Sequence, residues 1–178
     1  MNKIFCILCV AILACGCQQT TDNYYPSEKE CLCNDITKKV AIELKNELDL
    51  LPFGSGGRAM DQIKMLAISF LYRHPLEIAE GRELLIAAVE KFAAKINANE
   101  AIRPYLNNYP FGPKNIEIRI FIQAPNGKDF GSEKLCLIKA QEGFLEYEIH
   151  SGEYNLKTVY KETFEEALQK LNRAKQSA

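Results

Sequence analysis

The chain has 178 residues, of which 47% are hydrophobic and 25% charged, the balance of an ordinary globular protein. This length suits one domain and is short for two. The net charge of -1 gives no basic surface for nucleic acid and no electrostatic attraction to anionic lipid. Any attachment to a membrane must therefore have another origin.

The N-terminus has the features of an export signal. Asn2 and Lys3 precede an uninterrupted apolar run over residues 4–13, which is shorter than the roughly 20 residues of a membrane-spanning helix. Such a run is typical of the hydrophobic region of a signal peptide. The segment Ile12-Leu13-Ala14-Cys15 resembles the lipobox of bacterial lipoproteins, and the resemblance covers residues 1–17 only.

This resemblance implies that the chain is cut before Cys15, whose thiol takes a diacylglyceryl group and whose new amine is acylated, so that acyl chains attach it to membrane lipid. Cys17 is an alternative acceptor, and an uncleaved signal anchor or ordinary secretion also remains open. We expect a location in the cell envelope. Gly16, where an aspartate would imply inner-membrane retention, favours the outer membrane. The expected organisation is a signal peptide at 1–14, a lipidated N-terminus and polar tether at 15–26, and a single globular α+β domain at 27–178.

Seven cysteines raise the question of disulfides or a metal site. Export would permit disulfides, but the sequence selects no pairing. Cys31 and Cys33 are expected on one helix about 200° apart around its axis, so they cannot bridge each other. A site formed by Cys17, Cys31, Cys33 and Cys136 would lack the C-x-x-C pairs usual for zinc. We therefore predict no metal and no cofactor.

Two helices are predicted in the first half of the domain. Ser27 and Glu30 form a capping-box pattern ahead of apolar residues at helical spacing, which predicts a helix over about 27–50. Residues 51–57 are expected to end it as a loop. Residues 63–72 are apolar almost throughout, so periodicity leaves strand or helix open, with flanking glycines and Pro75 slightly favouring a strand. A second helix, from about 76 to 97, is indicated by Leu85, Ala88, Val89, Phe92 and Ile96.

The second half changes to a period of two. Isoleucines at 116, 118, 120 and 122 predict a half-buried strand. A turn at Glu142-Gly143 would set Lys139 opposite Glu146 and form an apolar face from Cys136, Ile138, Ala140, Leu145, Tyr147 and Ile149.

A second turn, at Ser151-Gly152, would place Tyr147 opposite Leu156 and Glu146 opposite Lys157. A charge row Lys139-Glu146-Lys157 would then cross three strands. A capping box at Thr163–Glu166 opens a last helix. The expected architecture is α+β, an antiparallel and possibly mixed sheet of four to five strands with helices packed on one face.

Two segments are candidate ligand or partner sites. The first comprises Gly54, Ser55, Gly56, Gly57 and Arg58, whose glycines could form an anion-binding nest of backbone N–H groups, although glycines that end a helix explain the segment more simply, without a function. It lacks the Lys-Ser or Lys-Thr of a phosphate loop and the earlier glycine of a nucleophile elbow.

The second segment, with Arg103, Tyr105, Tyr109 and Phe111, could be a recognition surface or a loop that packs on the sheet. The two segments together resemble small exported bacterial proteins that have no assigned activity, so this resemblance implies no chemistry.

No catalytic residues are predicted. His74 and His150 are the only histidines, and residue parity puts His150 on the opposite face from Cys136, which argues against a nucleophile pair. The leading hypothesis is a non-enzymatic envelope lipoprotein with a structural or partner-binding role and an envelope protein as partner. The alternative is an envelope hydrolase that uses carboxylates such as Glu77, Glu80 and Glu83, which are more simply the solvated face of a helix.

Overall fold

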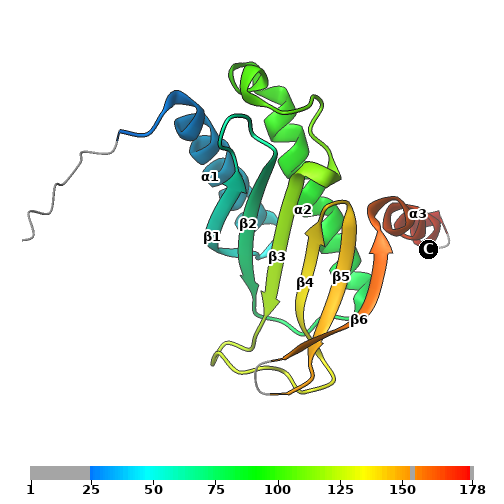
Figure 1. Cartoon of the computed structure of the whole chain (residues 1–178). Helices are drawn as coiled ribbons and strands as arrows, with labels where there is room; N and C mark the ends of the chain where they lie inside the picture. The colour runs from blue at the N-terminus through cyan, green and yellow to red at the C-terminus, as the bar shows by residue number, and fades with distance from the viewer. Residues whose placement is uncertain (1–24, 153–154, 177–178) are drawn as a thin grey trace, which may run out of the picture.

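The computed structural model describes residues 25–152 and 155–176, so the predicted signal peptide, both candidate acceptor cysteines and most of the predicted tether lie outside these ranges. One six-stranded sheet, in the spatial order β1-β2-β3-β4-β5-β6, forms the centre of the domain (Figure 1). Its strands are β1 (Leu51–Arg58), β2 (Met65–Tyr72), β3 (Ile116–Ile122), β4 (Leu135–Gln141), β5 (Phe144–His150) and β6 (Leu156–Thr163).

Only β2 and β3 run parallel, and every other neighbouring pair is antiparallel. A parallel pair needs a crossover connection. Helix α2 (Ile78–Ala98) supplies it, followed by the short 3-10 helices η1 (Glu100–Tyr105) and η2 (Pro113–Asn115). The prediction of an α+β fold with a mostly antiparallel sheet is confirmed. The prediction of four to five strands is wrong, because the segment expected as a loop at 51–57 pairs with β2.

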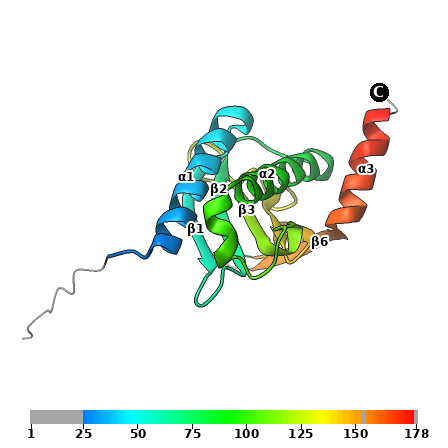
Figure 2. The same cartoon turned by 90° about the horizontal axis from the view of Figure 1, so that it is seen from above.

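Helices α1 (Glu28–Leu48) and α2 lie side by side on one face of the sheet (Figure 2). The capping box that begins α1 is present, since Ser27 N–H donates to Glu30 Oε2 over 2.7 Å and Glu30 N–H donates to Ser27 Oγ over 3.3 Å. The core between the helices and the sheet contains all the apolar positions that predicted α2, as well as the four alternating isoleucines of β3.

Residues 65–72 form a strand, which answers the question that periodicity left open. Leu66, Ile68 and Phe70 are buried toward the helices, while the residues between them are only half-buried. A central strand covered by helices on one face produces this alternation. The intervening residues Ala67 and Leu71 are themselves apolar, which is why the sequence reads as a continuous run.

The β4–β5 hairpin confirms one part of its predicted register and corrects another. Glu142 and Gly143 turn the chain with φ of 53° and 84°, and Lys139 Nζ lies 2.8 Å from Glu146 Oε2. Further along, however, the register shifts between Leu135 and Leu137. Leu135 takes the core position opposite Ile149. The extra residue, Cys136, is buried away from the core cluster, so the prediction that it shares the apolar face is wrong.

The predicted register of β5 with β6 is also wrong. Glu146 lies opposite Lys161 instead of Lys157, and Tyr147 lies opposite Tyr160 instead of Leu156. The connection extends over residues 151–155, closed by a 2.9 Å hydrogen bond from Ser151 N–H to Asn155 C=O, and a further shift follows at Val159. At Glu146 and Tyr147 the opposing residue moves by four positions, an even number, so side chains there keep their faces. A charge row therefore exists, with Lys161 Nζ 2.6 Å from Glu146 Oε1.

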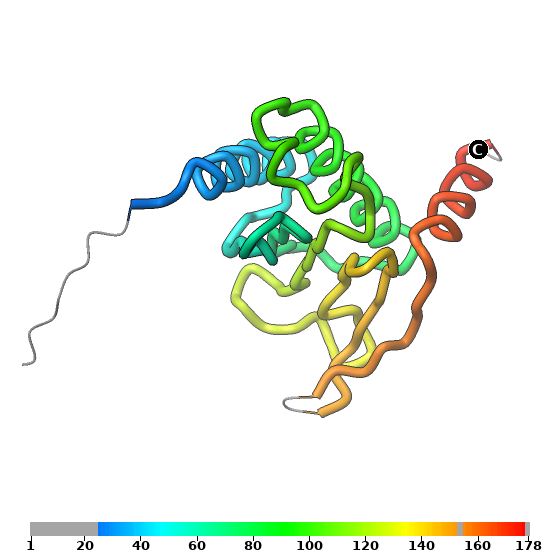
Figure 3. The backbone as a smooth tube through the Cα atoms, turned by 45° about the horizontal axis from the view of Figure 1, so that its top comes forward, coloured from blue at the N-terminus to red at the C-terminus, as the bar shows by residue number. Residues whose placement is uncertain are grey.

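Helix α3 (Phe164–Gln176) lies at the opposite edge of the sheet from α1 (Figure 3). Its predicted capping box is confirmed by a 2.9 Å bond from Thr163 N–H to Glu166 and a 3.2 Å bond from Glu166 N–H to the Thr163 hydroxyl. Phe164 and Ala167 are buried, and Leu168 and Leu171 pack against the core.

A buried carboxylate ties α3 to the rest of the domain. Glu162, with a side chain only 1% exposed, accepts hydrogen bonds from Arg82 of α2 at 2.7 Å, Lys170 of α3 at 2.8 Å and the Tyr147 hydroxyl at 2.9 Å. Burial alone would raise the pKa of Glu162, but these hydrogen bonds outweigh it and hold the pKa below its ordinary value.

Replacing Glu162 with alanine should reduce the free energy of unfolding by about 3–5 kcal/mol, because two cations would lose their buried counter-charge. The exposed Glu90 of α2 is the control, and Glu90→Ala should cost less than about 0.5 kcal/mol. Because the folded-state pKa is lowered, the contribution of Glu162 is complete above the titration range of a free glutamate and is lost as the pH falls below about 4.3. Urea melts between neutral and acidic pH should therefore show a steeper loss of stability in the wild type than in Glu162→Gln.

Candidate functional site: the groove between α1 and edge strand β1

Strand β1 is an open edge of the sheet. Only β2 pairs with it, and every residue from Pro52 to Arg58 is exposed, while Leu51 is half-buried. The glycine segment is thus extended backbone within a strand. The expectation of a loop with an anion-binding nest is wrong here, because pairing with the apolar β2 holds these residues in the sheet.

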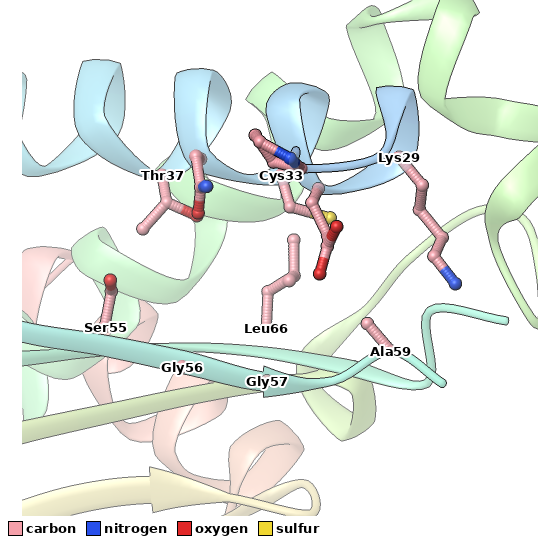
Figure 4. Close-up of a pocket in the computed structure, with 11 residues that line it drawn as sticks. Lys29, Cys33, Thr37, Ser55, Gly56, Gly57, Ala59 and Leu66 are labelled. Carbon is pink, nitrogen blue, oxygen red and sulfur yellow. The ribbon is translucent and has the colours of Figure 1, made fainter. Parts of the chain in front are cut away.

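A groove runs between α1 and β1. It consists of two adjoining hollows of about 240 Å³ and 480 Å³ that share Asn34, Thr37 and Ser55. In the close-up of the first hollow, Ser55 points up from β1 and Thr37 points down from α1, while Leu66 of β2 rises beside them toward Cys33 (Figure 4). We refer to the two hollows together as the α1–β1 groove. Its helix wall was not singled out from the sequence, where Asn34 and Thr37 differ little from other polar helix residues.

The groove combines apolar, hydroxyl and amide groups with charged groups of both signs, since Lys29 and Glu30 line the first hollow and Lys38 lines the second. Ile42, 49% exposed, and Lys38 contribute to the second hollow, while Cys33 contributes to the first. Burial raises the pKa of the Cys33 thiol, which therefore stays protonated at neutral pH. Lys29 closes one end by donating a hydrogen bond to the Met60 carbonyl. This composition suits recognition of a polar chain with some apolar side chains, and supplies no activated nucleophile.

The packing of β1 against β2 requires glycine at only one of the three glycine positions of this strand. A Cβ at Gly57 would lie 2.7 Å from the Met65 carbonyl oxygen, so the pairing with β2 requires glycine there. A Cβ at Gly56 would meet nothing within 4 Å, and one at Gly54 would make only an ordinary 3.7 Å contact with Ser69. The intramolecular packing therefore explains one glycine and leaves two unexplained.

The remaining candidate residues are dispersed. Arg58, at the end of β1, forms an exposed 3.3 Å ion pair with Glu142. In the aromatic segment, Phe111 is buried in the core and Tyr105 donates a 2.9 Å hydrogen bond to Glu28 at the start of α1. Tyr109 and Arg103 are exposed, and the Arg103 guanidinium lies 5.0 Å above the Tyr109 ring. The structure thus uses Phe111 and Tyr105 for packing and does not bring this segment into the α1–β1 groove.

A separate hollow, of about 280 Å³, is lined by both members of the rejected nucleophile pair. Because of the shift at Leu135–Leu137, Cys136 lines it together with His150 and Asp129, and His150 Nε2 lies 3.2 Å from Asp129 Oδ2. The parity argument that separated Cys136 from His150 is therefore wrong. Burial, aided by the Asp129 carboxylate, raises the pKa of the Cys136 thiol to about 11, and the thiol lies 3.4 Å from the Glu148 carbonyl, to which it donates. These conditions disfavour the thiolate that nucleophilic chemistry needs.

The carboxylates proposed for a hydrolase have structural partners. Glu77 and Glu80 form the cap of α2, where Glu77 N–H donates to Glu80 over 2.9 Å, and Glu77 also pairs with Lys134. Glu83 lies 3.8 Å from Lys175 of α3. Within residues 25–152 and 155–176, no three His, Cys, Asp or Glu side chains are grouped to hold a metal ion.

Comparison with protein-family models, with curated proteins and with solved structures finds no match for this chain. The function must therefore be inferred from the residues and their geometry.

The contrast between two neighbouring glycines tests the packing of β1. Gly57→Ala should lower the free energy of unfolding by about 1–3 kcal/mol, since the new methyl group would overlap a backbone carbonyl that cannot move freely. Gly56→Ala should be neutral or slightly stabilising, because its methyl group has open space. Thermal or urea melts of the two variants measure both effects, and equal losses would contradict the described packing.

Alkylation tests the state of Cys136. At pH 8 a thiol with a pKa of about 11 is thiolate in only about one molecule in a thousand, so Cys136 should react with iodoacetamide at least about a hundredfold more slowly than the exposed Cys31. Peptide mapping by mass spectrometry gives both rates in one sample. Denaturant should abolish the difference. Rapid labelling of folded Cys136 would instead reveal an activated thiol beside His150.

Proposed function

We propose that this protein is a lipid-anchored lipoprotein of a bacterial cell envelope whose domain binds an envelope protein through the α1–β1 groove. The observation that carries the binding role is the open edge strand with a groove alongside it. The lipobox-like segment at residues 12–15 supports the anchor, with Cys15 as acceptor and Cys17 as the alternative. Gly16 supports the outer membrane where the host has two.

The anchor and the groove would lie near each other. None of the helices in the described ranges is both long and apolar enough to cross a bilayer. Pro26 lines one end of the groove, and a chain from residue 15 to residue 26 spans at most about 40 Å when fully extended. An acylated Cys15 would therefore keep the groove within that distance of the membrane surface, where a partner in the same membrane is accessible.

A binding role also fits the chemistry of the groove better than catalysis. Its hydroxyl, amide and ammonium groups from Ser55, Thr37, Asn34 and Lys38 can form hydrogen bonds and an ion pair with a partner. The two cysteine-containing hollows have thiols whose pKa is raised, and the helix carboxylates are used in capping and ion pairs. These observations leave the hydrolase alternative without support from a specific group of side chains.

Metabolic labelling with a fatty-acid analogue tests the anchor. Wild-type protein should be labelled, and Cys15→Ser should lose the label and leave the membrane fraction because it removes the acceptor thiol. Cys17→Ser, two residues away, is the matched control and should remain labelled. If the control loses the label and Cys15→Ser keeps it, then Cys17 is the acceptor. Unlabelled wild-type protein would overturn the lipoprotein assignment.

The binding role is tested separately by site-specific photo-cross-linking in cells. A photoreactive amino acid at Ser55, in the groove, should give a discrete cross-linked product with an envelope protein. The same group at Val159, an exposed residue of the opposite edge strand β6, is the control and should give none. Equal products at both positions, or none at Ser55, would contradict a partner site in the α1–β1 groove.

A further inference from the structure

We infer that the α1–β1 groove binds an extended polypeptide segment that adds to β1 as a seventh strand and places an acidic side chain against Lys38. This inference rests on the proposed partner-binding role and specifies its chemistry. It rests on four features of the described residues: the free backbone edge, the two unexplained glycines, the difference between the two sheet edges, and the position of one lysine.

The first feature is the backbone of β1. Each residue of an antiparallel strand directs its N–H and C=O groups to one neighbour, and successive residues alternate between the two sides. Since β2 lies on one side only, about half of the backbone groups of β1 have no strand to bond. A peptide strand supplies matching donors and acceptors along the regular part of β1, residues 54–58, and its alternate side chains would enter the groove below α1.

The second feature is the presence of glycine at positions 54 and 56. Both have room for a side chain and neither has a positive φ, so the fold itself does not require glycine. Glycine in a strand is less favourable than alanine, because its backbone loses more conformational freedom on folding. Glycine within a strand is typical of a place where another backbone approaches closely. An incoming strand beside β1 gives these two residues a role that the isolated domain does not.

The third feature is the contrast between β1 and the other edge strand, β6. Edge strands are commonly protected against further pairing by lysines, bulges or a covering element. Strand β6 has Lys157, Lys161 and an extra residue at Val159, and α3 follows directly from it. Strand β1 has no charged residue before Arg58, and its own protecting features, a proline at position 52 and an irregularity between Pro52 and Gly54, leave residues 54–58 in regular pairing. Only one edge is therefore suited to accept a strand.

The fourth feature selects the charge of the peptide. Lys38 is the only charged residue that lines the second hollow, and it has no ion-pair partner among the described residues. It lies beside the first half of β1, near Pro52 to Ser55. By contrast the neighbouring Lys39 pairs with Asp35 at 2.7 Å and belongs to another surface of α1. A carboxylate on the added strand would be the natural partner of the unpaired ammonium group.

The test uses the full chain purified in detergent and a phage-displayed library of random peptides of eight residues, the length of β1. Enriched peptides should alternate β-branched with polar residues and carry Asp or Glu near one end. Hydrogen exchange should then show that a synthetic enriched peptide protects the amides of residues 53–58 and leaves those of β6 unchanged. Two versions of the peptide are then compared, one N-methylated at the odd positions and one at the even positions, so that each lacks the N–H donors of one strand edge. The version methylated on the edge that faces β1 should not bind, and the other version should bind as the unmodified peptide does.

Two charge-reversal variants on the same helix test the lysine. Lys38→Glu should weaken binding of the acidic peptide about tenfold, whereas Lys39→Glu should change it less than about twofold. Circular dichroism melts confirm that both variants fold.

Several results would overturn the inference: a library without enriched sequences, equal binding of the two N-methylated versions, protection at β6, or equal effects of the two lysine variants. Protection of β1 that rises with protein concentration in the absence of peptide would assign the edge to a second copy instead. The cross-linking result at Ser55 is independent of this test. A cross-linked partner together with a failed peptide test would retain partner binding and reject strand addition.

Discussion

The parallel pairing of β2 with β3 determines where every other element lies. Two parallel neighbours cannot be joined by a tight turn, so the chain must return along the sheet, and α2 does this across one face. The elements that precede β2 in the chain, α1 and β1, therefore lie toward one edge of the sheet. Everything after it, the meander from β3 to β6 and then α3, extends the sheet to the other edge. The candidate site follows from this constraint, because β1 has no further strand of the described chain to pair with.

The crossover also divides the two faces of the sheet. Helices α1 and α2 bury the apolar side chains of one face, and the other face carries the row of Lys139, Glu146 and Lys161. Glu162 is part of neither the apolar core nor this charge row, because its side chain is buried among Arg82, Lys170 and Tyr147. A carboxylate buried at this depth is tolerated because charged and hydroxyl donors surround it. Its closest partners, at 2.7 to 2.9 Å, come from α2, α3 and β5, so one side chain links the late elements of the chain to the crossover helix.

Helix α1 has two distinct surfaces, and this explains how one element serves both stability and binding. Val40 and Leu44 are fully buried in the core, while Asn34 and Lys38 face the groove on the edge side. Helical geometry separates such positions around the axis, so changes in the groove wall need not disturb the core. The same helix begins where the polar tether ends, which places the groove close to the proposed anchor.

Local patterns in the sequence correctly predicted the features that depend on nearest neighbours. The capping boxes at Ser27 and Thr163, the buried face of α2 and the turn at Glu142-Gly143 each involve residues a few positions apart, so a short stretch of sequence contains the whole interaction. The pair Lys139–Glu146 followed directly from that turn. The lipobox, likewise a short pattern, gives an expectation about residues outside the described ranges.

Only the tertiary structure decided the features that depend on a partner strand. Cys136 leaves the core face because one extra residue is accommodated against β5, and no local pattern marks that shift. Lys161 replaces Lys157 because the preceding connection is longer than a two-residue turn. The glycines of β1 are extended because β2 holds them, although alone they would favour a loop. The groove itself brings residues 34–42 and 52–57 together, and its existence depends on how α1 packs over an edge strand rather than on either segment alone.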